Sequence, residues 1–406
     1  TDLPVFFVDK DSRDSSFNWR ERVKQQSTEF DPVIGDPHDP FNILFSSGTT
    51  GKPKAIPWNQ TTPIKCAMDG HLHHDLQQGD VVAWPTNLGW MMGPWLIFAT
   101  LINKGVIAIY EDSPMGSEFG QFVQDARVNM LGLVPSIVRL WKRQQCMEPF
   151  DWSAIKTFSS TGEASNSDDM FYLSWLAGFK PIIEYCGGTE IGGGYISSTV
   201  VEPNVPAAFS TPAFGLDVQI VNENFGPDEE GELFITPPSI GLSIELLNRD
   251  HQHAYYQDCP RDNGGSPLRR HGDFFKQLGN GYFVAGGRTD DTMNLGGIKV
   301  SSIEIEQAID RLPQVAESAA VAVPLDRTGP DQLVVFYVPQ AGYALDAQDE
   351  LMQEMNQAIR AHLNPLFKVR QIVSKETLPR TASNKVMRRV LRQQFLPGSE
   401  INRKQG

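Results

Sequence analysis

The sequence lacks long apolar runs. No stretch approaches the roughly eighteen apolar residues of a membrane-spanning helix. The first residues, "TDLPVFFVDKDSRD", have no basic segment followed by an apolar one, so no signal peptide is predicted. The chain does not start with methionine and does not end in a peroxisomal tripeptide. We therefore expect a segment of a longer protein without a membrane span, located in the cytoplasm or an organelle matrix.

Cysteine and positive charge are also scarce. The four cysteines are far apart and form no C-x-x-C pair, which argues against a disulfide scaffold or a zinc ribbon and favours a reducing compartment. Asp and Glu number 49 against 35 Lys and Arg, which gives a formal net charge of −14. Such a chain is not expected to bind nucleic acid or anionic lipid broadly.

The sequence does contain alternating strand-like and helix-like runs from Phe41 to about Tyr185. The predicted strands are 41–45, 106–110, 129–134, 155–160 and 181–185, and the predicted helices include 90–102 and 135–144. This alternation predicts a largely parallel sheet covered by helices, in an α/β fold.

The pattern changes twice further along the chain. Two alternating strands joined by an Asn/Gly/Pro/Asp turn, within 216–236, predict a small β subdomain at about 211–289. Beyond "GGRTDD" a helix, two strands and a tail of helix and loop predict a compact α+β domain. We place the boundary at Asp290, with a core at 1–289 and a small domain at 290–406.

The segment "SSGTTGKPKA" (Ser46 to Ala55) follows the apolar run "FNILF", which is predicted to be a buried strand. A glycine-rich loop after a strand can present backbone N–H groups to phosphate oxygens, and hydroxyls and lysines add donors. The P-loop pattern G-x-x-x-x-G-K-[S/T] does not fit, because Pro53 follows the Gly51–Lys52 pair. By composition alone the segment could equally be a surface linker.

The full pattern Ser-Ser-Gly-Thr-Thr-Gly-x-Pro-Lys resembles the phosphate-loop signature of the adenylate-forming enzymes, nearest their acetyl- and short-chain acyl-CoA synthetase branch. In that family the loop wraps the β- and γ-phosphates of ATP. The resemblance therefore implies an adenylation core with a mobile C-terminal domain. It assigns to ATP binding Ser46, Ser47, Gly48, Thr49, Thr50, Gly51 and Lys54.

"EYCGGTEIGGG" (Glu184 to Gly194) resembles the family motif Y-G-x-T-E. The resemblance makes Thr189 a ligand of the α-phosphate and Glu190 the Mg²⁺ carboxylate, and Mg²⁺ prefers a few hard oxygens. Taken alone, the segment would be a helix-capping turn. The aromatic residue that stacks on adenine in many members falls on Cys186. Either Tyr185 substitutes for it or backbone contacts hold the adenine, and Glu184 joins Tyr185 among the predicted nucleotide contacts.

Two further motifs concern the nucleotide. "STGEA" resembles the G-E-P segment that lies along adenine, which assigns Gly162, Glu163 and Ala164. "HGDFF" resembles T-G-D, whose aspartate, here Asp273, binds the ribose. By the same resemblance Arg288 reaches the ribose or phosphates, and Asp290 is a hinge about which the small domain rotates.

The C-terminal motifs carry the remaining assignments. "NLGGIKVSSIEIE" resembles a motif that places Gly296 and Gly297 at the pantetheine channel and Lys299 near a phosphate. "LPRTASNKVMRRVLR" would otherwise be a basic amphipathic helix, but it resembles the motif of the catalytic lysine, here Lys385. An ammonium group between a carboxylate and the α-phosphate offsets their repulsion.

"LGWMMGPWL", which could simply be core, resembles the segment that lines the acyl pocket and assigns Trp90 and Met91. Acetyl-specific relatives carry a tryptophan where this chain has Gly187, followed by Gly188. We expect room for extra methylenes, each adding about 0.8 kcal/mol on burial, and hence an acid larger than acetate. "HLHHD" (71–75) is predicted to be an exposed helix and not a metal site.

The resemblance implies an ATP-dependent carboxylic acid–CoA ligase that uses ATP, Mg²⁺ and coenzyme A and forms an acyl-adenylate before the thioester. Alternatives are an enzyme that loads a carrier-protein thiol, a luciferase-like oxidase, and a non-catalytic nucleotide-binding homologue. Family members carry an N-terminal lobe before the phosphate loop, whereas about forty residues precede it here. The core is therefore expected to be incomplete at its N-terminus, and the oligomeric state stays open.

Overall fold

The computed structural model describes residues 19–46, 53–222, 224, 226–295, 298–323, 331–343, 348–381 and 386–395, with backbone alone at 19–21, 290, 294 and 299. The chain divides into two compact units, Thr1–Asp39 and Pro40–Gly406. The described residues of the first unit include the helix α1 (Trp19–Lys24). Everything below concerns the second unit.

A seven-stranded sheet with the order β4-β3-β5-β6-β7-β8-β9 forms the core of this unit. Its strands are β3 (Val81–Ala83), β4 (Val106–Ala108), β5 (Met130–Leu133), β6 (Thr157–Ser160), β7 (Ile182–Gly188), β8 (Gly193–Ser197) and β9 (Thr211–Pro212). Neighbours from β4 to β7 run parallel, and β8 and β9 are added antiparallel. The predicted parallel sheet is therefore present over most of its width.

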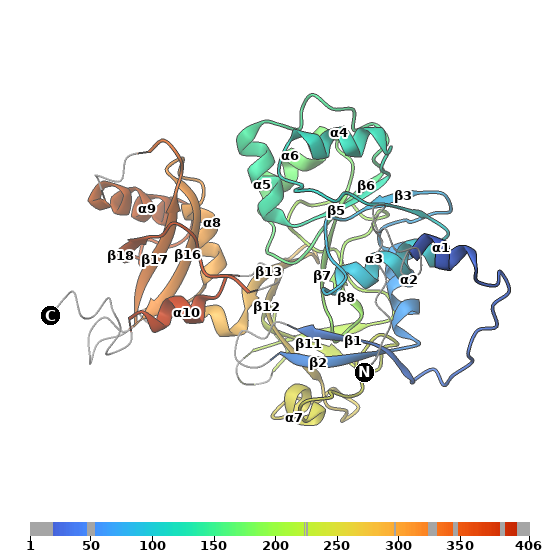
Figure 1. The fold of residues 1–406 in the computed structure, drawn as a ribbon. Helices are drawn as coiled ribbons and strands as arrows, with labels where there is room; N and C mark the ends of the chain where they lie inside the picture. The colour runs from blue at the N-terminus through green and yellow to red at the C-terminus, as the bar shows by residue number, and fades with distance from the viewer. Residues whose placement is uncertain are drawn as a thin grey trace. The chain divides into compact units, whose positions relative to one another are not determined.

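Helices cover both faces of this sheet (Figure 1). They are α2 (Thr62–Leu72), α3 (Met92–Ile102), α4 (Ser117–Asp125), α5 (Pro135–Gln144) and α6 (Ser167–Leu176). Successive strand residues point to opposite faces. On β5, Leu131 packs with α4, α5 and α6, whereas Met130 packs in the cluster that contains α2 and α3 residues. Helix α5 has the predicted bounds, with proline at its first position, where its fixed φ suits a helix start.

The strands beside the glycine-rich segment form a ribbon of their own. β1 (Pro40–Ser46) pairs antiparallel with β2 (Lys54–Asn59). The prediction of a buried strand at 41–45 is wrong for one face of β1. Leu44 is 4% exposed, but Phe41, Ile43 and Phe45 are 40%, 49% and 61% exposed. A strand with a core on one side alternates in this way.

The predicted β subdomain is an antiparallel sheet of β10 (Asp217–Val221), β11 (Glu230–Thr236), β12 (Arg269–Gln277) and β13 (Phe283–Arg288). Its core residues Leu233 and Phe275 belong to the same cluster as Tyr195 and Ile196 of β8. The short helix α7 (His251–Tyr256) lies between β11 and β12 in sequence. The subdomain therefore packs against the antiparallel end of the large sheet.

The C-terminal region is α+β, as predicted. Its elements are η2 (Thr289–Asp291), β14 (Thr292–Leu295), β15 (Ile298–Ser301), α8 (Ser302–Ile309), β16 (Val315–Val323), β17 (Gln332–Pro339), α9 (Gln348–His362), β18 (Val369–Ser374) and α10 (Arg388–Gln393). The sheet has the order β16-β17-β18. Residues of α8 and α9 pack with Val335 of β17, and Leu391 of α10 packs with Phe336, so helices cover both faces (Figure 1). The boundary at Asp290 stays a prediction.

The histidines of "HLHHD" are not all exposed, contrary to prediction. His73 is fully buried, with Nδ1 3.0 Å from Ser198 O, and its Nε2 accepts a hydrogen bond from Phe214 N at 3.0 Å. His74 is also buried, with Nε2 3.0 Å from Ser159 Oγ. Both rings are therefore part of the buried core.

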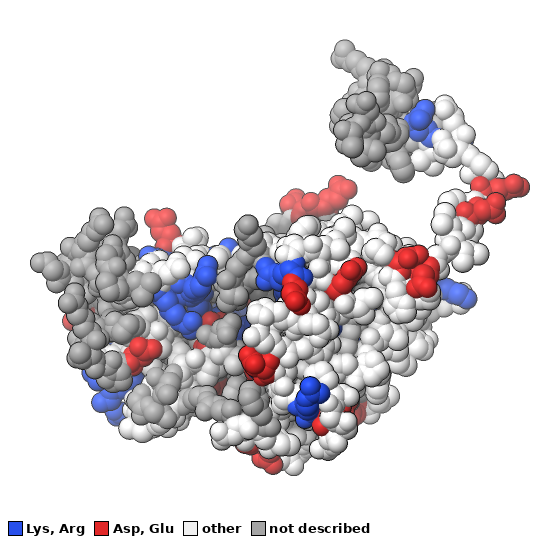
Figure 2. Space-filling model, turned by 90° about the horizontal axis from the view of Figure 1, so that it is seen from below, with Lys and Arg blue, Asp and Glu red and all other residues white. Residues whose placement is uncertain are grey.

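Among the described residues, no helix combines the length and apolar character that a membrane crossing needs. Figure 2 shows one face of the molecule, on which acidic and basic side chains are interspersed across a largely uncharged surface. On this face the negative net charge is not gathered into a single field.

Candidate active site

A cavity of about 1170 Å³ opens where the carboxyl ends of β6 and β7 meet the β subdomain. Ligand sites of open α/β sheets lie at this edge. The predicted residues that line it are Gly162, Glu163, Ala164, Glu184, Tyr185, Gly187, Asp273 and Arg288. Gly162 has a φ of +90°, which a residue with a side chain adopts with strain. The turn after β6 therefore needs its glycine.

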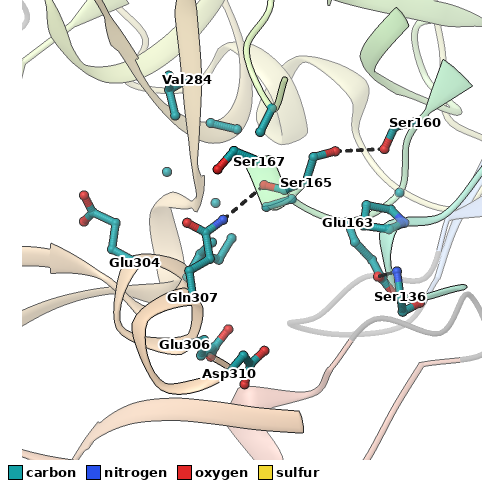
Figure 3. A pocket seen from close by; sticks show the side chains of 18 of the residues that line it. Ser136, Ser160, Glu163, Ser165, Ser167, Val284, Glu304, Glu306, Gln307 and Asp310 are labelled. Atoms are coloured by element: carbon teal, nitrogen blue, oxygen red, sulfur yellow. Dashed lines mark hydrogen bonds between the residues drawn. The ribbon is translucent and has the colours of Figure 1, made fainter. Parts of the chain in front are cut away.

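A chain of hydroxyl groups crosses one wall of the cavity (Figure 3). Ser165 Oγ lies 2.8 Å from Ser160 Oγ and donates to Glu184 Oε2 at 2.6 Å. From the small domain, Gln307 Nε2 donates to Ser165 O at 3.1 Å. Burial raises the pKa of Glu184 to about 7, although hydrogen bonds from Ser165 and the Ala207 amide act the other way. Glu184 therefore presents a carboxyl group that is partly protonated near neutral pH.

A second group of charged side chains, which we call the nucleotide-site cluster, reaches the cavity through His271, Asp273 and Arg288. Its members are Lys54, Glu190, His271, Asp273 and Arg288. Lys54 Nζ donates to Glu190 Oε1 at 2.8 Å, and Arg288 Nη1 donates to Asp273 Oδ1 at 3.0 Å. His271 stands between the two pairs, with Nδ1 3.9 Å from Glu190 Oε1 and Nε2 3.5 Å from Asp273 Oδ2. The structure thus brings together four predicted residues from four separate motifs.

The electrostatics of this cluster favour ionised carboxylates. Burial would raise the pKa of Glu190, but the charges of Lys54 and His271 outweigh it and hold that pKa well below its usual range. Burial lowers the pKa of His271 despite the nearby carboxylates. Asp273 also accepts a hydrogen bond from the hydroxyl of Tyr195. Glu190 is therefore held as an anion, and Asp273 accepts hydrogen bonds from Tyr195 and Arg288.

The turn that carries Thr189 and Glu190 is held by buried groups. Trp58 Nε1 donates to Thr189 O at 2.8 Å, and Ser243 N donates to Glu190 O at 2.8 Å. Gly194 N, at the start of β8, donates to Asp69 Oδ2 at 2.9 Å. The side chain of Glu190 therefore projects from a main chain fixed on several sides.

Tyr185 does not have the geometry for stacking on a nucleotide. Its ring is 1% exposed, and its hydroxyl donates to Asp69 Oδ2 at 2.5 Å and accepts from Trp95 Nε1 at 3.0 Å. Residues 184 and 186 project to the opposite face of β7, because a one-residue step on a strand reverses the direction of the side chain. This geometry disfavours stacking of adenine on Tyr185, and adenine held by backbone contacts stays a prediction.

The glycines predicted for the acyl pocket have a different structural reason. A Cβ on Gly187 would stand 2.0 Å from Gly193 O, and one on Gly188 would stand 2.7 Å from His271 Cε1. A side chain at position 187 is therefore excluded by the close approach of β8, so the glycine at this cavity-lining position does not stand for the space of a missing side chain. Trp90 is 38% exposed and Met91 packs against the core at the start of α3, and neither lines the cavity.

Several predicted residues cannot be placed. Outside the described residues lie Ser47, Gly48, Thr49, Thr50, Gly51, Gly296, Gly297 and Lys385, and the side chains of Asp290 and Lys299 are not described. Within the described part, Ser46 Oγ is buried and has no hydrogen-bond partner. Arg380 and Val386, which precede and follow the segment of Lys385, form a β-bridge and line the cavity.

Sequence reasoning missed several residues that shape this site, namely Trp58, Tyr195, Ser243, Tyr255, Arg269 and His271. His271 stands in the quoted motif "HGDFF", two residues before the aspartate predicted to bind the ribose, and could have been found there. The others come from segments that carry no motif. Their contacts arise from the fold.

Comparison with known protein families settles the relationship. The family model "AMP-binding enzyme" matches residues 3–243, and the model "AMP-binding enzyme C-terminal domain" matches residues 304–385. The chain belongs to the AMP-binding enzyme family. The resemblance found in the phosphate-loop motif is thereby confirmed for this AMP-binding enzyme.

Among curated relatives, a hexanoyl-CoA synthase from Cannabis sativa is 48% identical over 400 residues, covering 94% of this chain and 55% of that protein. A probable acyl-activating enzyme 17, peroxisomal, from Arabidopsis thaliana is 52% identical over 361 residues, covering 87% of this chain and 50% of that protein. An acetyl-coenzyme A synthetase from Wolinella succinogenes is 29% identical. The chain spans about half the length of the first two relatives.

Solved structures share the fold of this AMP-binding enzyme. An anthranilate CoA ligase in complex with anthranoyl-AMP matches with a TM-score of 0.80 at 20% identity, over 93% of this chain and 71% of that chain. An acetoacetyl-CoA synthetase from Streptomyces lividans matches with a TM-score of 0.74 at 26% identity, over 85% and 53%. The predicted fold class, an α/β adenylation core with a C-terminal α+β domain, is confirmed.

Proposed function

We propose that this chain contains the nucleotide-binding and catalytic part of an ATP-dependent carboxylic acid–CoA ligase. The observation that supports this most is the nucleotide-site cluster, in which a lysine–glutamate pair and an arginine–aspartate pair are linked by His271 beside the cavity. Fixed cations and ionised carboxylates in this arrangement suit a triphosphate with its sugar and metal ion.

In this proposal Gly162, Glu163 and Ala164 lie along the adenine, and Asp273 accepts hydrogen bonds from the ribose hydroxyls. Lys54, Arg288 and Thr189 contact the phosphates, together with the loop that follows Ser46. Lys299 adds a further phosphate contact. These roles follow the family motifs, and the cavity that Gly162, Asp273 and Arg288 share supports them.

Glu190 is the proposed Mg²⁺ ligand. The described residues contain no group of three or more His, Cys, Asp or Glu side chains that could hold a metal. One carboxylate fits Mg²⁺, because this ion commonly takes one or two protein carboxylates and completes its shell with phosphate oxygens and water. When bound, Mg²⁺ would neutralise phosphate charge that develops during the reaction.

The proposed chemistry has two steps. A carboxylate oxygen attacks the α-phosphorus, the bond to pyrophosphate breaks, and Lys385 offsets the repulsion between the two anions. The small domain then rotates about Asp290, and coenzyme A enters past Gly296 and Gly297. Its thiolate attacks the acyl carbonyl and AMP leaves. The adenylate thus replaces a poor leaving group with a good one.

The acid is proposed to be of short to medium chain, larger than acetate. The support comes from the relative named hexanoyl-CoA synthase, because the space argument from Gly187 does not hold in the structure. The same name favours coenzyme A over a carrier-protein thiol. Two Arabidopsis thaliana relatives have names that include "peroxisomal", and of the two predicted locations this favours an organelle matrix.

The test is carboxylate-dependent ATP–pyrophosphate exchange with acetate, butyrate, hexanoate and octanoate. We expect exchange that depends on Mg²⁺ and is strongest with hexanoate or its neighbours. A clear preference for acetate would refute the chain length, and no exchange with any acid would refute the ligase. Coenzyme A and a phosphopantetheinylated carrier protein, compared as acceptors, then identify the thiol.

A further inference from the structure

Tyr255 on α7 lies against the nucleotide-site cluster, although no motif points to it. Its side chain is buried, with 2% exposed. The hydroxyl lies 3.4 Å from Glu190 Oε1, and Lys54 Nζ stands 4.5 Å from the ring centroid. One side chain thus touches both members of the Lys54–Glu190 pair.

A second cation lies over the same ring. Arg269 Cζ is 4.2 Å from the ring centroid of Tyr255, and the arginine is 1% exposed. Arg269 donates to Ser243 O at 2.8 Å, to Ser243 Oγ at 2.7 Å and to Glu190 O at 3.3 Å. Arg269 therefore fixes the main chain of Glu190 and the ring of Tyr255 together.

The energetics of this arrangement favour a fixed Lys54. A lysine side chain loses considerable rotamer freedom when it is held in one place. A cation over an aromatic ring is attracted to its electron-rich face, and the attraction grows when water is excluded, as it is around a buried tyrosine. The attraction to the ring therefore offsets part of the entropy that Lys54 loses when its side chain is ordered, before any ligand binds.

The contacts also use one carboxylate oxygen in preference to the other. Lys54, Tyr255 and His271 all approach Glu190 Oε1, and none of these three contacts uses Oε2. Glu190 is thus held through Oε1. These contacts fix the position of Lys54 Nζ relative to Glu190 Oε2.

We propose that Tyr255 is a positioning residue that pre-assembles Lys54 and Glu190 for a metal-bound nucleoside triphosphate. The proposal rests on the proposed function, since it specifies how the triphosphate end of that site is organised. Tyr255 touches neither phosphate nor metal in this account. It acts through Lys54, with Arg269 holding the ring from the protein side.

The experiment is a double-mutant cycle with Tyr255→Leu and Lys54→Met, measured by calorimetric binding of the β,γ-methylene analogue of ATP with and without Mg²⁺. We expect Tyr255→Leu to weaken binding about tenfold. In the Lys54→Met background the same change should have little effect, because interacting residues are not additive. In pyrophosphate exchange, Tyr255→Leu should raise the KM for ATP and leave the KM for the acid unchanged.

Two further variants make the result specific. Tyr255→Phe keeps the ring and should restore binding to within about threefold, because the face of phenylalanine also attracts a cation. Tyr256→Leu, one residue along α7, is the matched control and should bind the analogue like the wild type. If thermal unfolding shows that Tyr255→Leu is unfolded, Tyr255→Met replaces it in the cycle.

The outcomes separate the two proposals. Equal weakening by Tyr255→Leu in both backgrounds, or an equal effect of Tyr256→Leu, would overturn the positioning role. A coupled cycle in a chain that binds the analogue but exchanges pyrophosphate with no acid would refute the ligase and leave the positioning role intact.

Discussion

Two clusters in this molecule contain the same types of basic and acidic side chains but differ in how these side chains contact one another. Both line the same cavity, the nucleotide-site cluster through His271, Asp273 and Arg288, and the second through Arg139, Asp310 and Ser318. The second, which we call the α5–α8 cluster, consists of Arg139 and Lys142 of α5, Asp169 of α6, and Asp310 and Ser318 of the small domain. Arg139 donates to Asp169 Oδ2 at 3.1 Å and also to Asp310, and Lys142 donates to Asp169 Oδ1 at 3.2 Å.

The difference lies in how the oxygens are used. In the α5–α8 cluster, Asp310 receives Arg139 on one oxygen and Ser318 on the other at 2.6 Å, and both oxygens of Asp169 are also bonded. In the nucleotide-site cluster Asp273 is likewise bonded on both oxygens, by Arg288 and by Tyr195, whereas three groups approach Glu190 at Oε1. The contacts of Asp169 and Asp310 join α5 and α6 to the small domain, whereas Glu190, with three groups at one oxygen, is the carboxylate proposed for Mg²⁺.

The largest expected effect is on activity, from Glu190→Gln. The amide keeps the shape and removes the charge, so pyrophosphate exchange should fall about 10²- to 10³-fold. Glu232→Gln, which breaks the Glu232–Arg270 pair away from the cavity, is the matched control and should retain exchange. Comparable exchange in the two variants would show that the charge of Glu190 is not needed for the reaction.

The next effect is on stability, from Arg139→Met. The change leaves Asp169 and Asp310 buried without the guanidinium, and removing one partner of a buried pair costs about 3–5 kcal/mol. Urea denaturation measures it as a lower free energy of unfolding. A loss below about 1 kcal/mol would show that the α5–α8 cluster does not hold the fold together.

A third carboxyl group sharpens the comparison through its pH dependence. Glu184 is buried among hydroxyl and amide donors, and its pKa rises from 4.5 to about 7. Between these values the folded chain binds more protons than the unfolded chain, so stability contributed by Glu184 falls as pH rises from about 5 to 7. The pKa of Glu190 is lowered, so the stability that Glu190 contributes is lost as the pH falls below 4.5, the pKa of this group in the unfolded chain.

The measurement is the free energy of unfolding from pH 5 to 8 in the wild type and in Glu184→Gln. The difference between them should change by up to about 1.4 kcal/mol per pH unit. A difference that is flat across this range would mean that Glu184 is ionised throughout, like Glu190.

The smallest effect is expected from Lys142→Met. Its side chain is 38% exposed, and its ion pair with the buried Asp169, which Arg139 also binds, is expected to contribute at most about 1 kcal/mol. Urea denaturation should therefore give nearly the wild-type free energy of unfolding. A loss of unfolding free energy as large as that of Arg139→Met would show that Lys142 stabilises the fold as much as Arg139 does.

The sequence predicted the order of elements well, because each is specified locally. Helix α5 could be read from its proline start and the parallel strands from their apolar runs. The burial of His73 and His74 could not be predicted, because their partners Ser198 and Ser159 lie far along the chain. The same holds for the exposed face of β1, since an apolar run does not reveal which side meets the core.

For the site, the motifs brought Lys54, Glu190, Asp273 and Arg288 to notice through resemblance, and the structure brings them together. Tyr255 and Arg269 belong to no motif. Their role depends on the contact between the tyrosine ring and the guanidinium group, which only the folded chain brings together. The glycine at 187 illustrates the opposite error. Sequence reasoning took a missing side chain for empty space, but the neighbouring strand fills it.

The outer face of β1 has a practical consequence for handling the protein. Phe41, Ile43 and Phe45 form a row of exposed apolar side chains on a ribbon of two strands. Exposed apolar rows on a strand favour association between copies of a chain. Charged replacements at Ile43 and Phe45 would be the first choice for keeping concentrated samples monodisperse, because they leave the inward-facing Leu44 untouched.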